Sequence, residues 1–141
     1  MKNNLSNAQR WLRQAAHDLK IAEHNFNDGF YSDACFMSEQ ASQKALKAFL
    51  FFGGERFVPM HSLTALVSEA VKKDKEFENL RDPAKILDKY YIPTRYPDAL
   101  PMPAVPFEEY DAGDAQEAID CAKAILNLAA DKARDKEERA R

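Results

Sequence analysis

The segment Tyr31–Phe52 reads YSDACFMSEQASQKALKAFLFF and decides the fold of this chain. Small residues recur along one line of it, alternately four and three positions apart: Ala34, Ser38, Ala41, Ala45 and Ala48. This spacing is typical of a helix that lies nearly parallel to its neighbours in a bundle. We therefore expect a central helix from Tyr31 to Phe52 that a second helix approaches closely.

A second apolar set covers much of the remaining circumference of this helix, so we expect it to contact more than one partner. That set is Cys35, Phe36, Leu46, Phe49, Leu50 and Phe52. The polar positions gather in the middle of the helix, at Glu39, Gln40, Gln43, Lys44 and Lys47. Polar groups on a buried helix must pair with one another or face a ligand, and the sequence leaves both alternatives open.

Long helices are also predicted before and after this segment. In the first, apolar residues repeat three and four positions apart at Leu12, Ala15, Leu19, Ala22 and Phe26. We expect this helix to run from an N-cap at Ser6 to about Asn27, where Gly29 can end it.

The last helix is predicted to begin near Asp111 or Asp114, because Asp114 and Glu117 form a capping-box pattern. Its charged end, about residues 134–141, reads as a solvated tail.

Two shorter helices are expected between the long ones. His61-Ser62-Leu63 opens one of them, and Asp82-Pro83 places an N-cap before a proline, which predicts another helix that ends near Tyr91. Residues 92–111 contain five prolines and predict a long loop. No stretch alternates like a β-strand. The sequence therefore predicts an all-α fold, an up-and-down bundle of four or five helices, as one domain over residues 1–141.

Composition and charge restrict the possible functions. The formal net charge is −3, so any contact with nucleic acid must use a local basic spot and not a basic field over the whole surface. No signal peptide and no run of 18 apolar residues occurs, so we expect a cytoplasmic protein with no membrane contact. Cys35 and Cys121 are expected to be reduced and buried. No metal-ligand spacing or glycine-rich phosphate motif occurs, so no metal or cofactor is expected.

Arg56 and His61 form the first candidate site, in the loop Arg-Phe-Val-Pro-Met-His that leads into a helix. Arginine can hold a phosphate with two hydrogen bonds, and histidine can transfer protons. Such a pair could cleave RNA without a metal ion, with the arginine stabilising the charge that develops on the phosphate. The alternative is a helix-capping histidine beside a solvated arginine.

The second candidate site is Thr94-Arg95-Tyr96-Pro97-Asp98, within the proline-rich loop. Arg95, Tyr96 and Asp98 can present a planar cation and an aromatic face together. The alternative is that Arg95 and Asp98 pair with the polar band of the central helix and hold the loop in place.

Taken together, these segments resemble the HEPN domain family. The matching motifs are AxxDLxxA (15–22), DGFYSDACF (28–36), EQASQKALKAFL (39–50), HSLxxL (61–66), YxxxRYPDA (91–99) and DAxEAIxxA (114–122). The resemblance implies a five-helix, mostly antiparallel bundle that commonly forms a homodimer. It also implies a partner, because relatives often act beside a minimal nucleotidyltransferase in toxin–antitoxin or nucleotide-handling pairs. Many members of the wider superfamily are metal-independent RNases with an arginine and a histidine at the spacing of Arg56 and His61.

Three functions remain open at this stage. The first is a homodimeric binding module, partnered by a minimal nucleotidyltransferase, that binds a nucleotide or RNA. Its ligand-binding residues would be His61, Arg95, Tyr96, Asp98, Lys44 and Lys47. The second is a metal-independent endoribonuclease that uses Arg56 and His61 as catalytic residues. The third is a structural interaction bundle whose polar cluster holds the long loop.

Overall fold

The computed structural model describes residues 2–140, with side chains from Leu5 to Arg139. Its five α-helices are α1 (Lys2–Asn27), α2 (Tyr31–Phe52), α3 (Leu63–Lys73), α4 (Arg81–Asp88) and α5 (Ala112–Ala140). Short 3₁₀ turns lie at Lys75–Leu80, Pro97–Ala99 and Pro106–Glu108. No residue of the described range belongs to a β-strand, which confirms the predicted all-α class.

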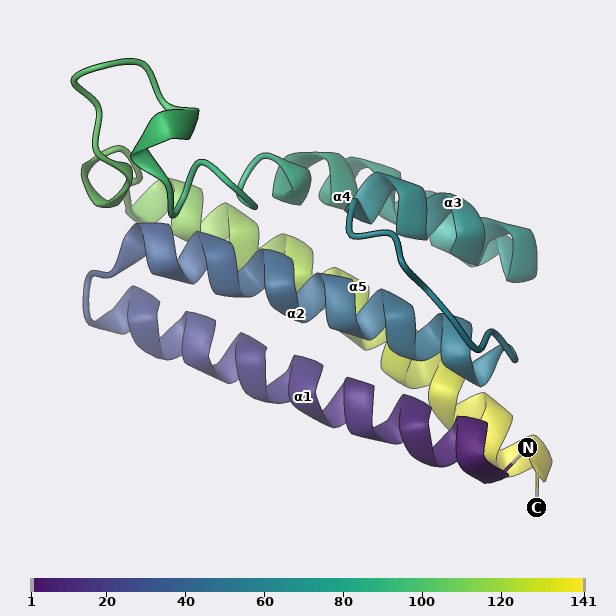
Figure 1. Cartoon of the computed structure of the whole chain (residues 1–141). Helices are drawn as coiled ribbons and strands as arrows, with labels where there is room; N and C mark the ends of the chain where they lie inside the picture. The colour runs from purple at the N-terminus through teal and green to yellow at the C-terminus, as the bar shows by residue number, and fades with distance from the viewer. Residues whose placement is uncertain (1, 141) are drawn as a thin grey trace.

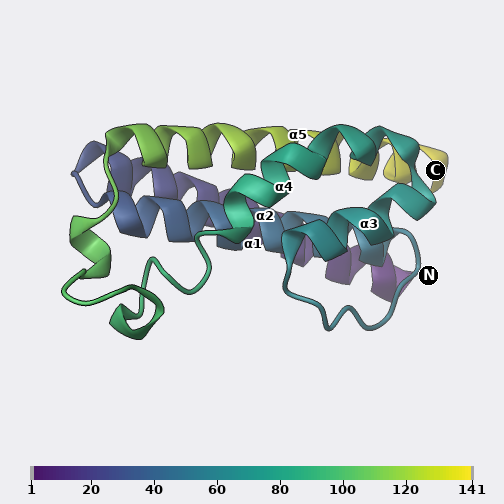
Figure 2. The same ribbon diagram turned by 90° about the horizontal axis from the view of Figure 1, so that it is seen from above.

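α2 lies at the centre of the bundle (Figure 1). α1 runs antiparallel to α2 along one side, and α5 packs along another side (Figures 1 and 2). α3 and α4 form a short antiparallel pair on the remaining side of α2 (Figure 2). Because this pair and the following loop return the chain to the start of α2, α5 runs parallel to α2 (Figure 1).

The small residues of α2 explain its central position. Ala34, Ser38, Ala41, Ala45 and Ala48 are all completely buried, as the spacing predicts. The buried hydroxyl of Ser38 on this line has a hydrogen-bond partner: its Oγ donates to the carbonyl of Ala34 at 2.8 Å. α2 contacts all four other helices, so the prediction of more than one partner is confirmed.

The two helix ends that the sequence marks with glycine are found where expected. Gly29 (φ +83°) follows α1, and Gly54 (φ +98°) follows α2. Both lie in the left-handed region, which a residue with a side chain adopts only with strain.

The start of α1 differs from the prediction. Ser6 is not an N-cap, because the helix already begins at Lys2. The reason is that the apolar stripe continues one turn earlier than expected: Leu5 packs on the core and Ala8 is completely buried.

The start of α4 also differs. α4 begins at Arg81, directly after the 3₁₀ turn, so Asp82 is not its N-cap and Pro83 occupies the third helical position. Proline is tolerated there because the first turn of a helix has no internal partner for that N–H. The helix ends at Asp88 and does not reach Tyr91.

For α5 the structure decides between the two expected starts. The Asp111 amide donates to Asp114 Oδ2 at 3.0 Å, and the Asp114 amide donates to Asp111 Oδ1 at 2.9 Å. This is the reciprocal arrangement of a capping box, with Asp111 as the cap. Asp114 with Glu117, the predicted pair, is therefore not the capping box.

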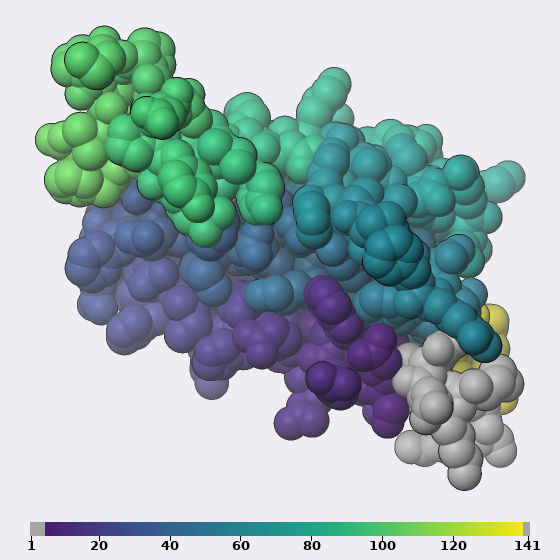
Figure 3. Space-filling view, in the orientation of Figure 1, coloured from purple at the N-terminus to yellow at the C-terminus, as the bar shows by residue number. Residues whose placement is uncertain are grey.

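The proline-rich loop between α4 and α5 projects from one end of the bundle (Figure 3, green). Its base is ordered by Thr94, a buried residue whose hydroxyl donates to the carbonyl of Tyr90, and by edge-to-face contact of Tyr90 with Tyr110. Farther out it exposes large apolar side chains, among them Met102 and Phe107.

The remaining expectations concern cysteines and membrane contact. Cys35 is buried, Cys121 is half-buried, and both are free thiols. No helix among the described residues combines the length and apolar character that crossing a membrane requires.

Candidate functional site

The polar positions in the middle of α2 form a connected band. Glu39 is completely buried, and its carboxylate accepts hydrogen bonds from Gln40 Nε2 at 2.7 Å and Gln43 Nε2 at 3.2 Å. Residues 39, 43 and 47 are four positions apart and therefore lie on one face of the helix. The band leads from the buried carboxyl group toward the end of α2.

Burial raises the pKa of Glu39 to about 7. Nearby Asp88 acts in the same direction, whereas the hydrogen bonds from Gln40 and Gln43 and the charge of Arg95 lower that pKa. A carboxyl group with this pKa changes its charge near neutral pH.

His61 attaches to the outer part of the band. Its Nδ1 lies 3.1 Å from Gln43 Oε1 and 3.3 Å from Lys47 Nζ. One ring nitrogen cannot donate to Gln43 and accept from Lys47 at the same time. When Nδ1 carries the proton and donates to Gln43, Nε2 presents a lone pair away from the band and can act as a base. When Nδ1 accepts from Lys47, Nε2 carries the proton and can donate to an anion such as a phosphate. His61 itself is exposed, so this nitrogen can meet a ligand.

Asp88, at the end of α4, holds the backbone beside His61. Its carboxylate accepts from the Leu63 amide at 2.6 Å, the Thr64 amide at 3.1 Å and the Ser62 hydroxyl at 3.0 Å. Ser62 is the N-cap of α3 and accepts from Ala65 N at 3.4 Å, so the capping residue is Ser62 and not His61, which the sequence offered as the alternative. A carboxylate at a helix N-terminus is favourable in charge and geometry. The residue before this cap, His61, is therefore fixed against α2.

Lys47 is the cation of this site. It is only 5% exposed, and its ammonium lies 5.7 Å from the centroid of the Trp11 ring of α1. None of the ion pairs among the described side chains includes Lys47. Burial lowers the pKa of Lys47, and the Glu39 charge opposes that change. A buried cation without a paired carboxylate creates a local positive potential that favours an anion.

Arg95 lies at the other end of the band. Its guanidinium stacks on Phe36 of α2 with 4.1 Å to the ring centroid, and it also lies 5.0 Å from the Tyr96 ring. The charge of Arg95 lowers the pKa of Glu39. Arg95 and Tyr96 are both exposed, so the stacked cation can be reached by a ligand.

The other predicted site residues are not part of this arrangement. Lys44 forms an ion pair with the buried Asp18 of α1, so its charge is neutralised within the protein. Asp98 is exposed in the 3₁₀ turn Pro97–Ala99. Arg56 is exposed in the loop after α2, and no hydrogen bond or ion pair among the described side chains joins it to His61.

The polar side chains of α2 therefore do both of the things that the sequence left open: some pair within the protein, and others face a possible ligand. Glu39 pairs within α2 and Lys44 pairs with α1, whereas Gln43 and Lys47 meet His61. The sequence named Lys47, His61, Arg95 and Tyr96 but not Asp88 or Trp11 as site residues. Asp88 had no local signal, because its partners lie 24 to 26 positions away.

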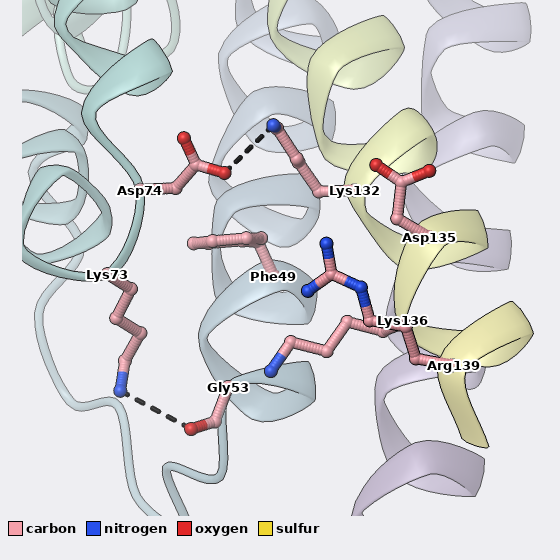
Figure 4. Close-up of a pocket in the computed structure, with 8 residues that line it drawn as sticks. All are labelled: Phe49, Gly53, Lys73, Asp74, Lys132, Asp135, Lys136 and Arg139. Carbon is pink, nitrogen blue, oxygen red and sulfur yellow. Dashed lines mark hydrogen bonds and ion pairs between the residues drawn. The ribbon is translucent and has the colours of Figure 1, made fainter.

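A separate cavity of about 350 Å³ lies where α2, α3 and α5 end (Figure 4). Two of its four cations are used by the protein: Lys132 pairs with Asp74 at 2.9 Å, and Lys73 Nζ donates to the Gly53 carbonyl at 3.4 Å. Lys136 and Arg139 of α5 also line it (Figure 4). This cavity lacks a histidine, so we do not assign the site to it.

Within the described residues, no group of three or more His, Cys, Asp or Glu side chains could hold a metal ion.

Several solved structures and sequences are similar to this chain. TT1696 from Thermus thermophilus is 40% identical, with a TM-score of 0.81, over 89% of this chain and 97% of that one. ST0689, described as an archaeal HEPN homologue, is 35% identical, with a TM-score of 0.74, over 89% and 97% of the two chains.

Two curated sequences are also similar. "Putative toxin MJ1304" from Methanocaldococcus jannaschii is 27% identical over 94% of this chain and 92% of that protein. Human sacsin is 26% identical over 84% of this chain, which spans only 3% of the length of sacsin. The HEPN domain profile matches residues 8–133. This chain belongs to the HEPN domain family.

Proposed function

We propose that this protein is a toxin-type HEPN protein that binds RNA phosphates along the outer face of α2. The observation that carries the proposal is Lys47, a buried cation without a carboxylate partner, in contact with the exposed His61. Arg95, stacked on Phe36, supplies a second cationic point. Similarity to a protein named as a toxin supports the toxin-type assignment.

The spacing of the two cationic points favours RNA over a single nucleotide. Arg95 lies over residue 36 of α2, and His61 lies against residues 43 and 47. At 1.5 Å per residue, these positions are roughly 10 to 16 Å apart along the helix. A polymer with successive phosphates can contact both points, whereas one phosphate can contact only one of them.

The proposal includes two protein partners. A homodimer and a minimal nucleotidyltransferase are what the family resemblance implies for this chain. The exposed side chains of Phe57 (78%), Met102 (94%) and Phe107 (70%) provide apolar surface for such contacts. The mass of the free protein in solution tests the homodimer, and an increase in mass with the added nucleotidyltransferase tests the second partner.

A metal-independent endoribonuclease is the second candidate function. It is favoured by the orientation of His61, whose ring is held by Gln43 so that Nε2 can act as a base toward a 2′-hydroxyl. Arg56 is exposed and can stabilise the phosphate charge only if RNA or a second subunit brings it to His61.

One experiment tests binding and cleavage together. A dye-labelled single-stranded RNA is incubated with the protein in EDTA, and both its fluorescence anisotropy and the ends of any product are measured. We expect His61→Ala to weaken binding by at least about tenfold, on the order of the loss of one charge-assisted contact. The control His17→Ala, an exposed histidine of α1, should bind like the wild type.

The outcomes separate the three functions. Products with 2′,3′-cyclic phosphates that disappear in His61→Ala would assign the endoribonuclease. Binding that is lost in His61→Ala without cleavage would support the binding protein. If the wild type does not bind RNA, or if His61→Ala binds equally well, the proposal is wrong and the structural bundle is favoured.

A further inference from the structure

A shallow hollow of about 300 Å³ lies between α1 and α2, lined by Arg10, Trp11, Gln14 and Lys44. Its volume is at the lower end of the range in which proteins bind small organic groups. The hollow is separate from the cavity at the ends of α2 and α5 and shares none of its residues.

Trp11 offers a fixed aromatic surface in this hollow. Its ring packs against Phe51 of α2 at 5.6 Å between centroids and is only partly buried. Packing against Phe51 restricts the ring, so little conformational entropy is lost when a ligand stacks on it.

The charges around Trp11 favour an anionic strand. Arg10 is exposed, and none of the ion pairs among the described side chains includes it. The acidic group nearby, Asp18, is 3% exposed and is covered by Lys44 and by Gln14, whose Nε2 donates to it at 2.9 Å. Aromatic rings flanked by cations are the pattern with which proteins hold single-stranded nucleic acid.

Lys47 connects this hollow to the proposed RNA site. Its ammonium lies 3.3 Å from His61 Nδ1 and 5.7 Å from the Trp11 centroid. A phosphate held at His61 and Lys47 therefore has the hollow beside it. We propose that Trp11 stacks a nucleobase of the bound RNA strand, with Arg10 at the following phosphate. This proposal rests on the proposed function and extends it to single-stranded RNA as the ligand.

The test uses the fact that Trp11 is the single tryptophan of the chain. Its intrinsic emission is recorded during titration with a short single-stranded RNA, while anisotropy of a dye-labelled copy measures binding independently. We expect the emission to be quenched with the same dissociation constant as the anisotropy gives. An abasic ribose-phosphate strand of the same length should quench far less, because it has no base to stack.

Three variants complete the test. Trp11→Leu should weaken RNA binding on the order of tenfold, the effect of one lost stacking contact. Arg10→Gln, at an exposed position where folding is not at risk, should also weaken RNA binding. Because Arg10 is proposed to contact a phosphate and not a base, binding of the abasic strand can report the loss of this contact. Lys136→Gln, in the separate cavity, is the matched control and should bind like the wild type.

Each result decides between the two proposals. RNA that binds by anisotropy without changing the Trp11 emission would overturn the stacking and leave the RNA-binding function intact. Absence of both signals would overturn both. An emission change that follows protein concentration without RNA would also overturn the stacking, because it would place a second subunit over Trp11.

Discussion

A carboxyl group without access to water lies in the middle of α2. Glu39 is completely buried, its hydrogen bonds come from the neutral amides of Gln40 and Gln43, and no ion pair among the described side chains includes it. An ionised carboxylate in such a place costs free energy unless a cation neutralises it. Arg95 at the surface compensates only in part, because burial still raises the pKa of Glu39 to about 7.

This group should make stability depend on pH. In the unfolded chain the Glu39 carboxyl has its ordinary pKa of 4.5, and in the folded protein its pKa is about 7. Between these values the folded state binds more protons, so the free energy of unfolding falls as pH rises through this window. The fall attributable to Glu39 is on the order of 3 kcal/mol.

Glu39→Gln should remove that dependence, because an amide does not ionise. We expect the variant to be more stable than the wild type at pH 8 and close to it at pH 4, measured by urea unfolding. Glu108→Gln, at an exposed position, is the control and should follow the wild type at both values. An equal difference between Glu39→Gln and wild type at both pH values would contradict the assignment.

At the scale of single residues, the sequence predicted which side chains were chemically capable but not which of them meet. His61 and Lys47 were both candidates, and the structure brings them to 3.3 Å. Arg56, five positions from His61, shares no hydrogen bond or ion pair with it among the described side chains, and both residues are exposed. Two residues that are close in sequence within a loop need not be close in space. On a helix, by contrast, a spacing of four, as between residues 43 and 47, places both side chains on the same face.

Helix boundaries show the same distinction at the scale of elements. α2 begins at Tyr31 and ends at Phe52, as predicted, because small residues define its buried line and glycines follow it. The predicted starts of α1 and α4 were wrong, because the packing of Leu5 and the 3₁₀ turn that runs directly into α4 outweighed the local capping residues. Local capping contributes about 1 kcal/mol, which burial of an apolar turn can exceed.

The element that positions His61 is the start of α3, and it depends on Asp88 of α4. Asp88→Ala should leave the Leu63 and Thr64 amides without their acceptor, at a cost of about 2 kcal/mol in stability. RNA binding should weaken as well, because His61 is no longer held against α2. Chemical denaturation and RNA anisotropy measure the two effects.

Asp82→Ala provides the control on the same helix, because Asp82 is exposed in the first turn of α4. Its effect on stability should be a few tenths of a kcal/mol, with RNA affinity unchanged. If Asp88→Ala lowers stability without altering RNA affinity, then Asp88 supports the helix but does not position the site.

At the scale of the whole molecule, the residues of the proposed site follow one line along α2. Arg95 lies over Phe36, His61 lies against Gln43 and Lys47, and Trp11 packs on Phe51. They come from α1, the loop before α3 and the loop before α5, so only the tertiary fold brings them together. The central helix was predictable from its own residues, but this line was not, because it depends on the paths of two loops.

Because the net charge is −3, the salt dependence of RNA affinity can test whether RNA is bound by the few cations along this line. A protein without a broad basic surface can neutralise only the phosphates that meet its local cations, here about three, at Lys47 with His61, at Arg95 and at Arg10. For single strands the slope of log K against log salt is about −0.7 per phosphate, so we expect a slope of about −2. Arg95→Gln should reduce its magnitude by about 0.7, and Lys136→Gln should leave it unchanged. The measurement is RNA anisotropy between low and moderate KCl. A much steeper slope, or one that Arg95→Gln does not alter, would mean that RNA is held by a different and wider surface than this line along α2.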